Sequence, residues 1–264
     1  MTPLLSRVAV ILAGLPIVIA SAVVGGWFLF AVLAVGGLIA LHELYSLARG
    51  LRPLVLAGYG GILGALLGAE LGGAEWMLAG FLVTFPLAFL FATVSATRQS
   101  TTVAVGATVL GASWVGLGLA HFILLRRLDA DGAVAILAVL FTVFATDTAA
   151  FVTGRLVGRH KMTPVMSPGK TWEGLAAGTA AGLAVAFLVL YETEYAGWRS
   201  IVVGATLVAA ATVGDLFVSL VKRDLGAKDT GRILLGHGGM LDRVDALLFA
   251  GPVGYYALLA VGQG

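Results

Sequence analysis

The sequence predicts an all-α polytopic membrane protein, and three observations carry that prediction. Hydrophobic residues make up 59% of the 264-residue chain and charged residues only 11%, whereas a soluble domain carries about 25% charged residues. The mean hydropathy is +1.02. Apolar runs of roughly 18 residues or more recur from end to end, and each is long enough to cross a hydrocarbon layer about 30 Å thick. We therefore expect lipid to surround most of the chain.

Hydropathy and its interruptions predict about nine transmembrane helices. In chain order they cover residues 8–24, 27–47, 54–71, 75–95, 102–124, 133–154, 172–191, 200–221 and 244–261. Only Gly25-Gly26 separates the first two, so a count of about eight spans is the alternative. Arg7 and the apolar run after it also resemble a secretory signal peptide, but the hydrophobic chain continues almost without pause, which favours a retained first helix.

The basic residues alternate between the two sets of loops, and this alternation predicts the orientation of the chain. If the N-terminus is inside, only three of the 16 Lys and Arg residues lie in the outer loops, namely Arg126, Arg127 and Arg199. The outer loops carry acids instead, namely Glu70, Glu75, Asp129, Asp131, Glu192 and Glu194. Because Lys and Arg collect on the cytoplasmic side, we expect a cytoplasmic N-terminus, an outside C-terminus and a multi-pass protein of the cell membrane, most simply a bacterial inner membrane.

The composition also limits the function and the domain count. The chain has no cysteine, which excludes a disulfide framework, a thiolate zinc site and a cysteine nucleophile. Its formal net charge of +2 is too small to indicate nucleic-acid binding. With no repeat or linker in view, we expect a single integral membrane domain over residues 1–264, in which residues 1–130 are mainly scaffold and residues 131–264 carry the active site.

Glycine recurs at helical spacing in two of the predicted spans. The positions are Gly60, Gly64 and Gly68 in one, and Gly174, Gly178 and Gly182 in the other. Small residues four apart let helices approach closely in lipid. Packing within the chain explains both series, and a homodimer through the same faces is the alternative.

Two acids inside the predicted spans indicate where chemistry takes place. An acid at membrane depth is costly and usually faces a polar cavity. Asp147 and Asp215 each lie roughly 10–12 Å along a helix from its cytoplasmic end, so the two carboxylates share a depth. Pairing with a neighbouring basic residue would explain either acid alone. Two acids at one depth, beside the long charged connections 155–173 and 222–243, favour a metal or substrate site.

Polar residues extend from Asp215 along one face of its helix. Ser219, Lys222 and Arg223 follow at helical spacing, so they form a stripe that leads out of the membrane. The two basic residues would also suit snorkelling to lipid headgroups. The connection that follows the stripe therefore decides between these interpretations.

The segment 228–245 is the richest in polar residues and glycine. It contains Lys228, Asp229, His237, Gly238, Gly239, Asp242, Arg243 and Asp245. Asp242 and Asp245 are three apart at the start of the last predicted helix, so they lie on one face. Helix capping explains two acids but not the preceding Gly-His-Gly-Gly, whose glycines let the backbone come close to a ligand.

A third polar element precedes the seventh predicted span. It contains Ser167, Pro168, Lys170, Thr171 and Glu173. We expect Ser167 to cap a helix whose first residue is Pro168, and a helix N-terminus beside a lysine is an anion site. A P-loop is excluded, because that motif needs a glycine where this chain has Pro164. Carboxylates suited to Mg²⁺ and basic residues suited to phosphates together indicate phosphate chemistry on a lipid.

The run from Ser219 to Asp245 resembles the characteristic motif of phosphatidate cytidylyltransferases, also called CDP-diacylglycerol synthases. The matching residues are Ser219, Lys222, Arg223, Lys228, Asp229, Gly231, His237, Gly238, Gly239, Asp242, Arg243 and Asp245. The runs 144–148 and 167–174 are also similar to that family. Two residues depart from its pattern: Leu235 stands where the family usually has proline, and Gly169 where it often has a basic or polar residue.

The resemblance implies transfer of a cytidylyl group from CTP to phosphatidate at the bilayer surface, with CDP-diacylglycerol and pyrophosphate as products and Mg²⁺ as cofactor. Asp215 and Asp242 are then the preferred metal ligands. They form the catalytic group together with Asp147, Lys222 and Arg223. The substrate-binding residues are Ser167, Lys170, Thr171, Glu173, Ser219, Lys228, Asp229, His237, Gly238, Gly239, Arg243 and Asp245.

Two other functions fit parts of this pattern. A transporter or channel would also have buried acids in many helices, but it would predict acids spread through the membrane depth and inverted repeats. A CTP-dependent nucleotidyltransferase acting on another lipid phosphate, such as an isoprenoid or ether lipid, would keep the same motifs. Residues around the phosphates do not read the acyl chains, so the sequence leaves that alternative open.

Overall fold

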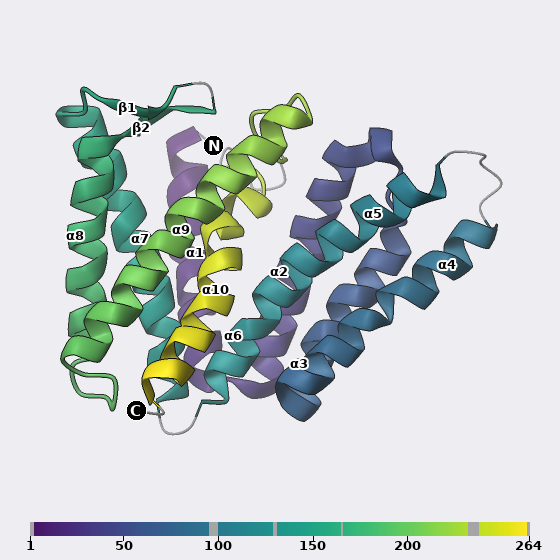
Figure 1. Ribbon diagram of the computed structural model, residues 1–264, viewed down its shortest axis with the longest axis horizontal. Helices are drawn as coiled ribbons and strands as arrows, with labels where there is room; N and C mark the ends of the chain where they lie inside the picture. The colour runs from purple at the N-terminus through teal and green to yellow at the C-terminus, as the bar shows by residue number, and fades with distance from the viewer. Residues whose placement is uncertain (1–2, 95–99, 129–130, 165, 232–237, 263–264) are drawn as a thin grey trace. The chain divides into compact units, whose positions relative to one another are not determined.

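The computed structural model describes residues 3–94, 100–128, 131–164, 166–231 and 238–262, with side chains from residue 14 onwards. Its helices are α1 (Pro3–Val24), α2 (Gly26–Leu47), the 3₁₀ turn η1 (Ala48–Leu51), α3 (Val55–Leu82), α4 (Thr84–Val94), α5 (Thr101–Gly111), the π-helical stretch η2 (Ala112–Leu117), α6 (Gly118–Arg126), α7 (Gly132–Leu156), α8 (Trp172–Val189), α9 (Trp198–Asp224) and α10 (Leu241–Gly262) (Figure 1). The predicted all-α class is confirmed, apart from one short hairpin, β1 (Lys161–Thr163) and β2 (Ser167–Thr171).

The chain divides into two compact units. The N-terminal unit consists of Met1–Leu124 together with Leu225–Val244, and the C-terminal unit of Leu125–Asp224 together with Asp245–Gly264. The segment Leu225–Val244 therefore folds with the first half of the chain, and its described residues, 225–231 and 238–244, are called the motif segment here.

Seven helical stretches in the described part of the chain are long and apolar enough to cross a membrane. They are Gly26–Leu51, Val55–Val94, Thr101–Arg126, Gly132–Leu156, Trp172–Val189, Trp198–Asp224 and Leu241–Gly262. Two differences separate them from the nine predicted spans. The described apolar part of α1, Gly14–Val24, is shorter than a span, and the predicted spans 54–71 and 75–95 lie in one stretch. Gly73 interrupts that stretch, with φ 78° and ψ −154°.

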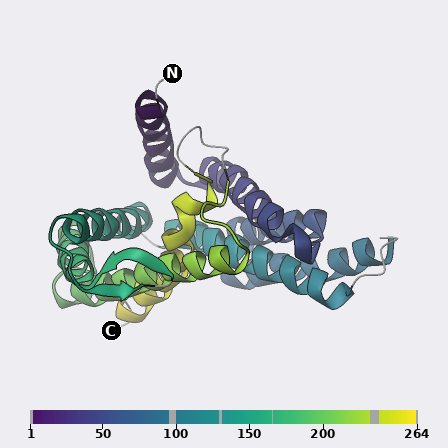
Figure 2. The same cartoon turned by 90° about the horizontal axis from the view of Figure 1, so that it is seen from above.

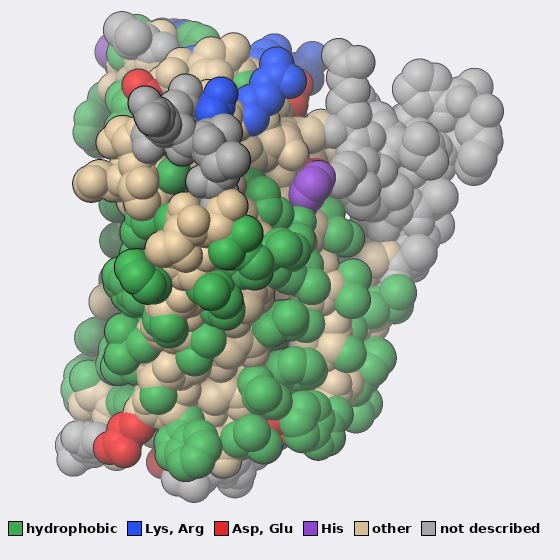
Figure 3. Space-filling model, turned by 90° about the vertical axis from the view of Figure 1, so that its right-hand side faces the viewer, with side chains coloured by type: hydrophobic (Ala, Val, Ile, Leu, Met, Phe, Trp, Pro, Cys, Tyr) green, Lys and Arg blue, Asp and Glu red, His purple; other side chains and the backbone are tan. Residues whose placement is uncertain are grey.

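Large hydrophobic side chains cover much of the outer surface. Phe89 is 72% exposed and Trp76 is 61% exposed. Hydrophobic side chains dominate the face in Figure 3, and Lys and Arg gather near one end of it. Exposing such an apolar surface to water would cost free energy, whereas contact with lipid chains would not. The chain is thus a multi-pass membrane protein.

The N-terminal unit is held together by close backbone packing and buried hydrogen bonds. The two halves of α3 pack so closely that a Cβ on Gly64 or Gly68 would meet the backbone of Gly80 or Trp76. Leu41, Ile62, Leu66 and Ile123 are fully buried in its core. The Tyr45 hydroxyl of α2 donates to the Thr108 carbonyl of α5 at 2.6 Å. This bond links two helices that carry none of the predicted site residues.

In the C-terminal unit, α7 and α8 pack side by side through small residues (Figures 1 and 2). A Cβ on Gly174 would lie 2.6 Å from the Ala150 carbonyl oxygen, and one on Gly178 would lie 2.7 Å from that of Thr146. Gly182 likewise faces Thr146. Packing within the chain is therefore confirmed for the series in α8, as for the one in α3. A homodimer through the same glycine-rich faces stays a prediction.

The start of α8 differs from the sequence prediction. Ser167 was expected to cap a helix beginning at Pro168, but both residues lie in β2, which pairs antiparallel with β1 (Figure 2). Thr171 is the N-cap instead, since its backbone is extended and its hydroxyl accepts from the Gly174 N–H at 3.1 Å. Pairing with β1 satisfies the backbone of this segment before the helix begins, and the turn of the hairpin had no clear signal in the sequence.

Candidate active site

An ion pair in the C-terminal unit joins two of the predicted site residues. Lys170 extends from β2 and Asp215 from α9, and Lys170 Nζ lies 2.8 Å from Asp215 Oδ2. The Nζ atom itself is inaccessible to water. The hairpin thus brings a basic side chain onto the acid that opens the polar stripe of α9. No helical spacing predicted this contact.

Two further acids surround the pair. Asp147 of α7 lies close enough to Asp215 and Lys170 for their charges to interact. Asp245 of α10 interacts in the same way with Asp147, Asp215 and Lys222. The common depth inferred for Asp147 and Asp215 thus corresponds to spatial proximity. The structure adds Asp245 to them, so residues from β2, α7, α9 and α10 form one cluster, called the acid cluster here.

Close packing of α9 and α10 sets the position of Asp245. A Cβ on Gly214 would lie 3.2 Å from the Asp245 carbonyl oxygen and 3.0 Å from the Phe249 ring. The rings of Phe217 and Phe249 also pack together in a tilted arrangement, with centroids 5.3 Å apart. A glycine directly before Asp215 therefore lets the two helices approach at the level of their acids.

The acid cluster contains carboxyl oxygens, the donors that hard divalent cations bind. Three carboxylates face the two ammonium groups of Lys170 and Lys222. In the described part of the chain, no group of three or more His, Asp or Glu side chains is arranged to hold a metal ion unaided. Mg²⁺ does not require such a cage, because it commonly binds one or two carboxylates together with water and substrate phosphates. The donor set therefore fits Mg²⁺ delivered with a phosphate substrate.

Glu173, at the start of α8, is held by a residue that the sequence did not single out. Its carboxylate accepts from the His160 backbone N–H at 3.2 Å and lies 2.6 Å from His160 Nδ1. The Trp172 N–H donates to the His160 carbonyl at 3.0 Å. His160 therefore fixes the end of the hairpin against the first turn of α8. Nothing in its sequence spacing points to Glu173.

In the N-terminal unit, Asp242 organises the motif segment. Its Oδ2 atom accepts hydrogen bonds from the Thr230 N–H at 2.9 Å, the Thr230 hydroxyl at 2.9 Å and the Gly239 N–H at 3.0 Å. Gly238 has φ 78°, a conformation that favours glycine. Asp215 belongs to the C-terminal unit, so a metal ion shared by Asp215 and Asp242 stays a prediction.

The remaining predicted residues are distributed over both units. Ser167, Ser219, Lys222 and Arg223 belong to the C-terminal unit, and Lys228, Asp229, Gly238, Gly239 and Arg243 to the N-terminal unit. Arg223, Lys228, Asp229 and Arg243 are exposed. His237 and Leu235 lie outside the described residues.

One acid of the N-terminal unit was missed altogether. Glu43 of α2 accepts a hydrogen bond from the Leu241 N–H at 2.9 Å, at the start of α10. The signal was present, because an acid in an apolar span is a candidate functional residue by that fact alone. The sequence prediction assigns residues 1–130 mainly to the scaffold and therefore does not include this acid.

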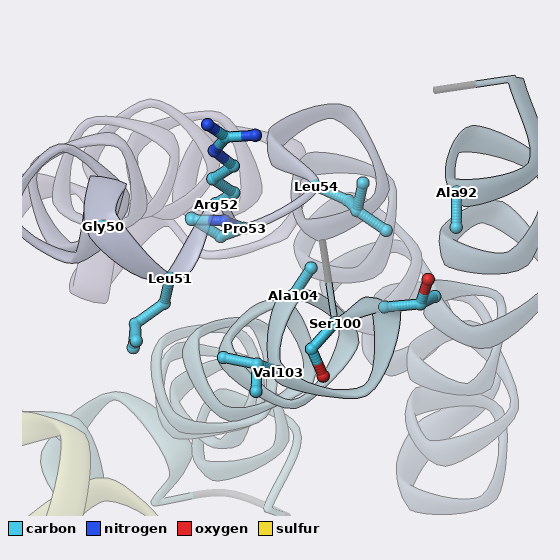
Figure 4. A pocket seen from close by; sticks show the side chains of 10 residues that line it. Gly50, Leu51, Arg52, Pro53, Leu54, Ala92, Ser100, Val103 and Ala104 are labelled. Carbon is cyan, nitrogen blue, oxygen red and sulfur yellow. The ribbon is translucent and has the colours of Figure 1, made fainter. Parts of the chain in front are cut away.

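A cavity of about 380 Å³ lies in the N-terminal unit, between the chain at Arg52–Leu54 and the start of α5 (Figure 4). Its wall includes Arg52, Ser100 and Thr101. None of the residues that the sequence predicts for the site lines it. The acid cluster and the motif segment, rather than this cavity, carry the predicted chemistry.

Known proteins resemble this chain over most of its length. The model of the cytidylyltransferase family matches residues 5–261. Phosphatidate cytidylyltransferases of Staphylococcus haemolyticus and Mycobacterium leprae are each 40% identical to it, over 147 and 155 residues. These matches cover 55% and 58% of this chain but 55% and 49% of those proteins. The protein of that name from Mycobacterium bovis is 34% identical over 239 residues, which are 83% of this chain and 76% of that protein. The matched part of the chain thus spans about half the length of the first two relatives.

Proposed function

Since the chain belongs to the cytidylyltransferase family, we propose that it transfers a cytidylyl group from CTP to phosphatidate. The products are CDP-diacylglycerol and pyrophosphate, as part of phospholipid biosynthesis. The observation that carries the proposal is the acid cluster, in which Asp215 pairs with Lys170 at 2.8 Å and lies within electrostatic reach of Asp147 and Asp245. A transporter does not require carboxylates paired with a hairpin lysine, whereas a nucleotidyltransferase needs acidic groups for the metal and basic groups for the phosphates.

The reaction places modest demands on the protein. A phosphate oxygen of phosphatidate attacks the α-phosphorus of CTP, and the bond from that phosphorus to the β-phosphate bridging oxygen breaks. A phosphomonoester is largely dianionic near neutrality, since its second pKa is about 6, so no strong general base is required. Catalysis then rests on positioning the two phosphates and neutralising their charge. Lys170 and Lys222 supply that charge within the acid cluster.

Mg²⁺ is part of the proposal. It would be held by Asp215, with Asp147 and Asp245 as neighbouring carboxylates, and Asp242 stays the second ligand that the sequence predicts. When bound, the ion would withdraw charge from the phosphate oxygens of the nucleotide. Lys170 keeps Asp215 in place and limits the repulsion between Asp215 and Asp147.

The topology belongs to the same proposal. We infer nine spans, with α1 as the first and the interruption at Gly73 dividing Val55–Val94 into two. The N-terminus and the active site then face the cytoplasm, where CTP is available, and the protein lies in the bacterial inner membrane. The support is the distribution of Lys and Arg over the loops.

The direct test supplies the purified protein with CTP, Mg²⁺ and phosphatidate and measures pyrophosphate and CDP-diacylglycerol. We expect both products, little turnover with ATP or GTP, and none after chelation of the metal. Product with an isoprenoid phosphate or an ether-lipid phosphate, but none with phosphatidate, would replace the acceptor in the proposal. Absence of product with every lipid phosphate would contradict it.

A further inference from the structure

Glu43 is a buried acid in an otherwise apolar helix. The residue is only 3% exposed and lies in α2, within the candidate membrane span Gly26–Leu51. A buried carboxyl group is costly unless hydrogen bonds compensate the lost water. Its surroundings should therefore contain donors placed for it.

Those donors come from the motif segment at the other end of the chain. Glu43 Oε2 accepts from the Leu241 N–H at 2.9 Å and lies 3.3 Å from the Thr230 hydroxyl. Leu241 is the first residue of α10, and the first N–H groups of a helix have no partner within the helix. A negative charge at that position is also favoured by the helix dipole. Glu43 thus caps α10 from a different helix.

The same network includes Asp242. The Thr230 hydroxyl lies between two carboxylates, 3.3 Å from Glu43 and 2.9 Å from Asp242. A hydroxyl group has one proton, and the shorter distance assigns it to Asp242. Asp242 binds Thr230 and Gly239, and Glu43 binds Leu241. Together the two acids tie the part of the motif segment near Thr230 to the start of α10.

The motif segment also fits tightly around the Glu43 carboxylate. A Cβ on Gly231 would lie 2.6 Å from Glu43 Oε1, and a Cβ on Gly239 would collide with Glu43 Oε2 and the Thr230 hydroxyl. Oε1 is buried and has no hydrogen-bond partner in the described part of the chain. Two glycines of the motif are thus required by the acid they pack against.

We propose that Glu43 is a positioning residue for the motif segment. It acts as a hydrogen-bond acceptor that fixes the start of α10, and hence Asp242 and the exposed basic side chains Lys228 and Arg243, in one arrangement. The proposal rests on the proposed function, because it takes the motif segment as part of the substrate site. It predicts that loss of the acceptor loosens this segment and weakens catalysis without affecting the rest of the N-terminal unit.

The experiment compares two substitutions of Glu43 in the full-length protein in lipid nanodiscs. Glu43→Leu removes both acceptor oxygens, whereas Glu43→Gln keeps one for the Leu241 N–H and places its amide nitrogen on the side of the unpartnered oxygen. We expect Glu43→Leu to speed hydrogen exchange of the Thr230, Gly239 and Leu241 amides by about tenfold or more. The Leu241 amide loses its charged acceptor. The Thr230 and Gly239 amides donate to Asp242, whose position depends on the start of α10. Its kcat/KM for CTP should fall by a similar factor, and Glu43→Gln should stay within about threefold of the wild type in both measurements.

Tyr45→Phe is the matched control. It removes a buried hydrogen bond of the same helix, from Tyr45 to the Thr108 carbonyl, so it should lower the Tm but leave exchange in the motif segment unchanged. If Glu43→Leu does not fold, Gly231→Ala probes the contact from the other side and should give the same faster exchange. The proposal would be overturned if the Glu43 variant exchanged these amides as slowly as the wild type. It would also be overturned if exchange became faster while kcat/KM stayed at the wild-type value. A wild-type protein without cytidylyltransferase activity would defeat the proposed function instead, and the exchange data would still test Glu43.

Discussion

Lys170 Nζ and Asp215 Oδ2 are 2.8 Å apart, which joins the short hairpin before α8 to the acid inside α9. An acid in a membrane helix has few ways to remain charged, and a paired lysine is one of them. With Asp147 and Asp245 in electrostatic reach, this pair forms the centre of the acid cluster. Its chemical role can be tested residue by residue.

Asp215→Asn should lower turnover by at least two orders of magnitude. The substitution preserves size but removes the charge that would bind Mg²⁺, and a hundredfold loss corresponds to about 2.7 kcal/mol in the barrier. The measurement is kcat at saturating CTP and Mg²⁺, with membrane insertion and yield checked in parallel. Glu194→Gln, an exposed acid of the same unit outside the cluster, should be nearly silent. Near-full activity with an unchanged Mg²⁺ dependence would make Asp215 a structural residue.

Lys170 and Asp215 should behave as a coupled pair. Lys170→Met leaves Asp215 without its partner, so the double variant should lose less activity than the product of the two single losses. A coupling of about 0.5–3 kcal/mol in the barrier is expected for residues in contact. The values of kcat/KM for the wild type, both single variants and the double variant provide the cycle. The pair Asp215→Asn and Glu194→Gln should be additive, and additivity of the Lys170 cycle would show that the ion pair has no role in turnover.

Asp242→Asn separates two roles of the same carboxylate. As a hydrogen-bond acceptor for Thr230 and Gly239, Asn can substitute for Asp, whereas as a metal ligand it lacks the charge. Because the sequence predicts a metal ligand, we expect turnover to fall by at least a hundredfold. We also expect the variant to bind Mg²⁺ more weakly, so that half-maximal turnover requires a higher Mg²⁺ concentration. Hydrogen exchange in the motif segment should remain close to that of the wild type. Turnover near the wild-type level would restrict Asp242 to organising the segment.

The orientation can be tested with single cysteines, since the chain has none of its own. Arg159 and Asp229 are exposed residues of the two charged connections, and Glu194 is exposed in the connection before α9. Asp229 is a better position than Gly231, where a side chain would collide with Glu43. An impermeant thiol reagent added to intact cells should label Glu194→Cys and leave Arg159→Cys and Asp229→Cys unlabelled. Labelling at position 229 from outside would reverse the topology.

Helical periodicity predicted the parts of the fold and site that depend on a single helix. The class, most spans and the common level of Asp147 and Asp215 follow from hydropathy and the rise per residue. Contacts that form where the chain reverses direction, as in the β1–β2 hairpin, could not be predicted in this way. Ser167 and Pro168 carry the local signal of a helix start, but pairing with β1 places them in a strand. The interruption of α3 at Gly73 lies between two spans that hydropathy had already separated.

Long-range contacts were the other gap. Glu43 was visible as an acid in an apolar run, yet its partners Thr230 and Leu241 lie in the motif segment. No local spacing connects such residues, and the first half of the chain lacked a recognisable motif. The resemblance identified which glycines belong to the motif, whereas the structure supplies a physical reason for Gly231 and Gly239.

The composition of the N-terminal unit has a consequence for biosynthesis. This unit includes Leu225–Val244, which is synthesised long after Glu43, because Thr230 follows Glu43 by 187 residues. Glu43 is therefore made well before Leu241, the residue whose N–H donates to it. Until then its carboxyl group must find water, a proton or a temporary partner. Assembly of the N-terminal unit is therefore completed only once residues 225–244 have been made, and a chain truncated before residue 225 would leave the Glu43 carboxylate without the Leu241 N–H.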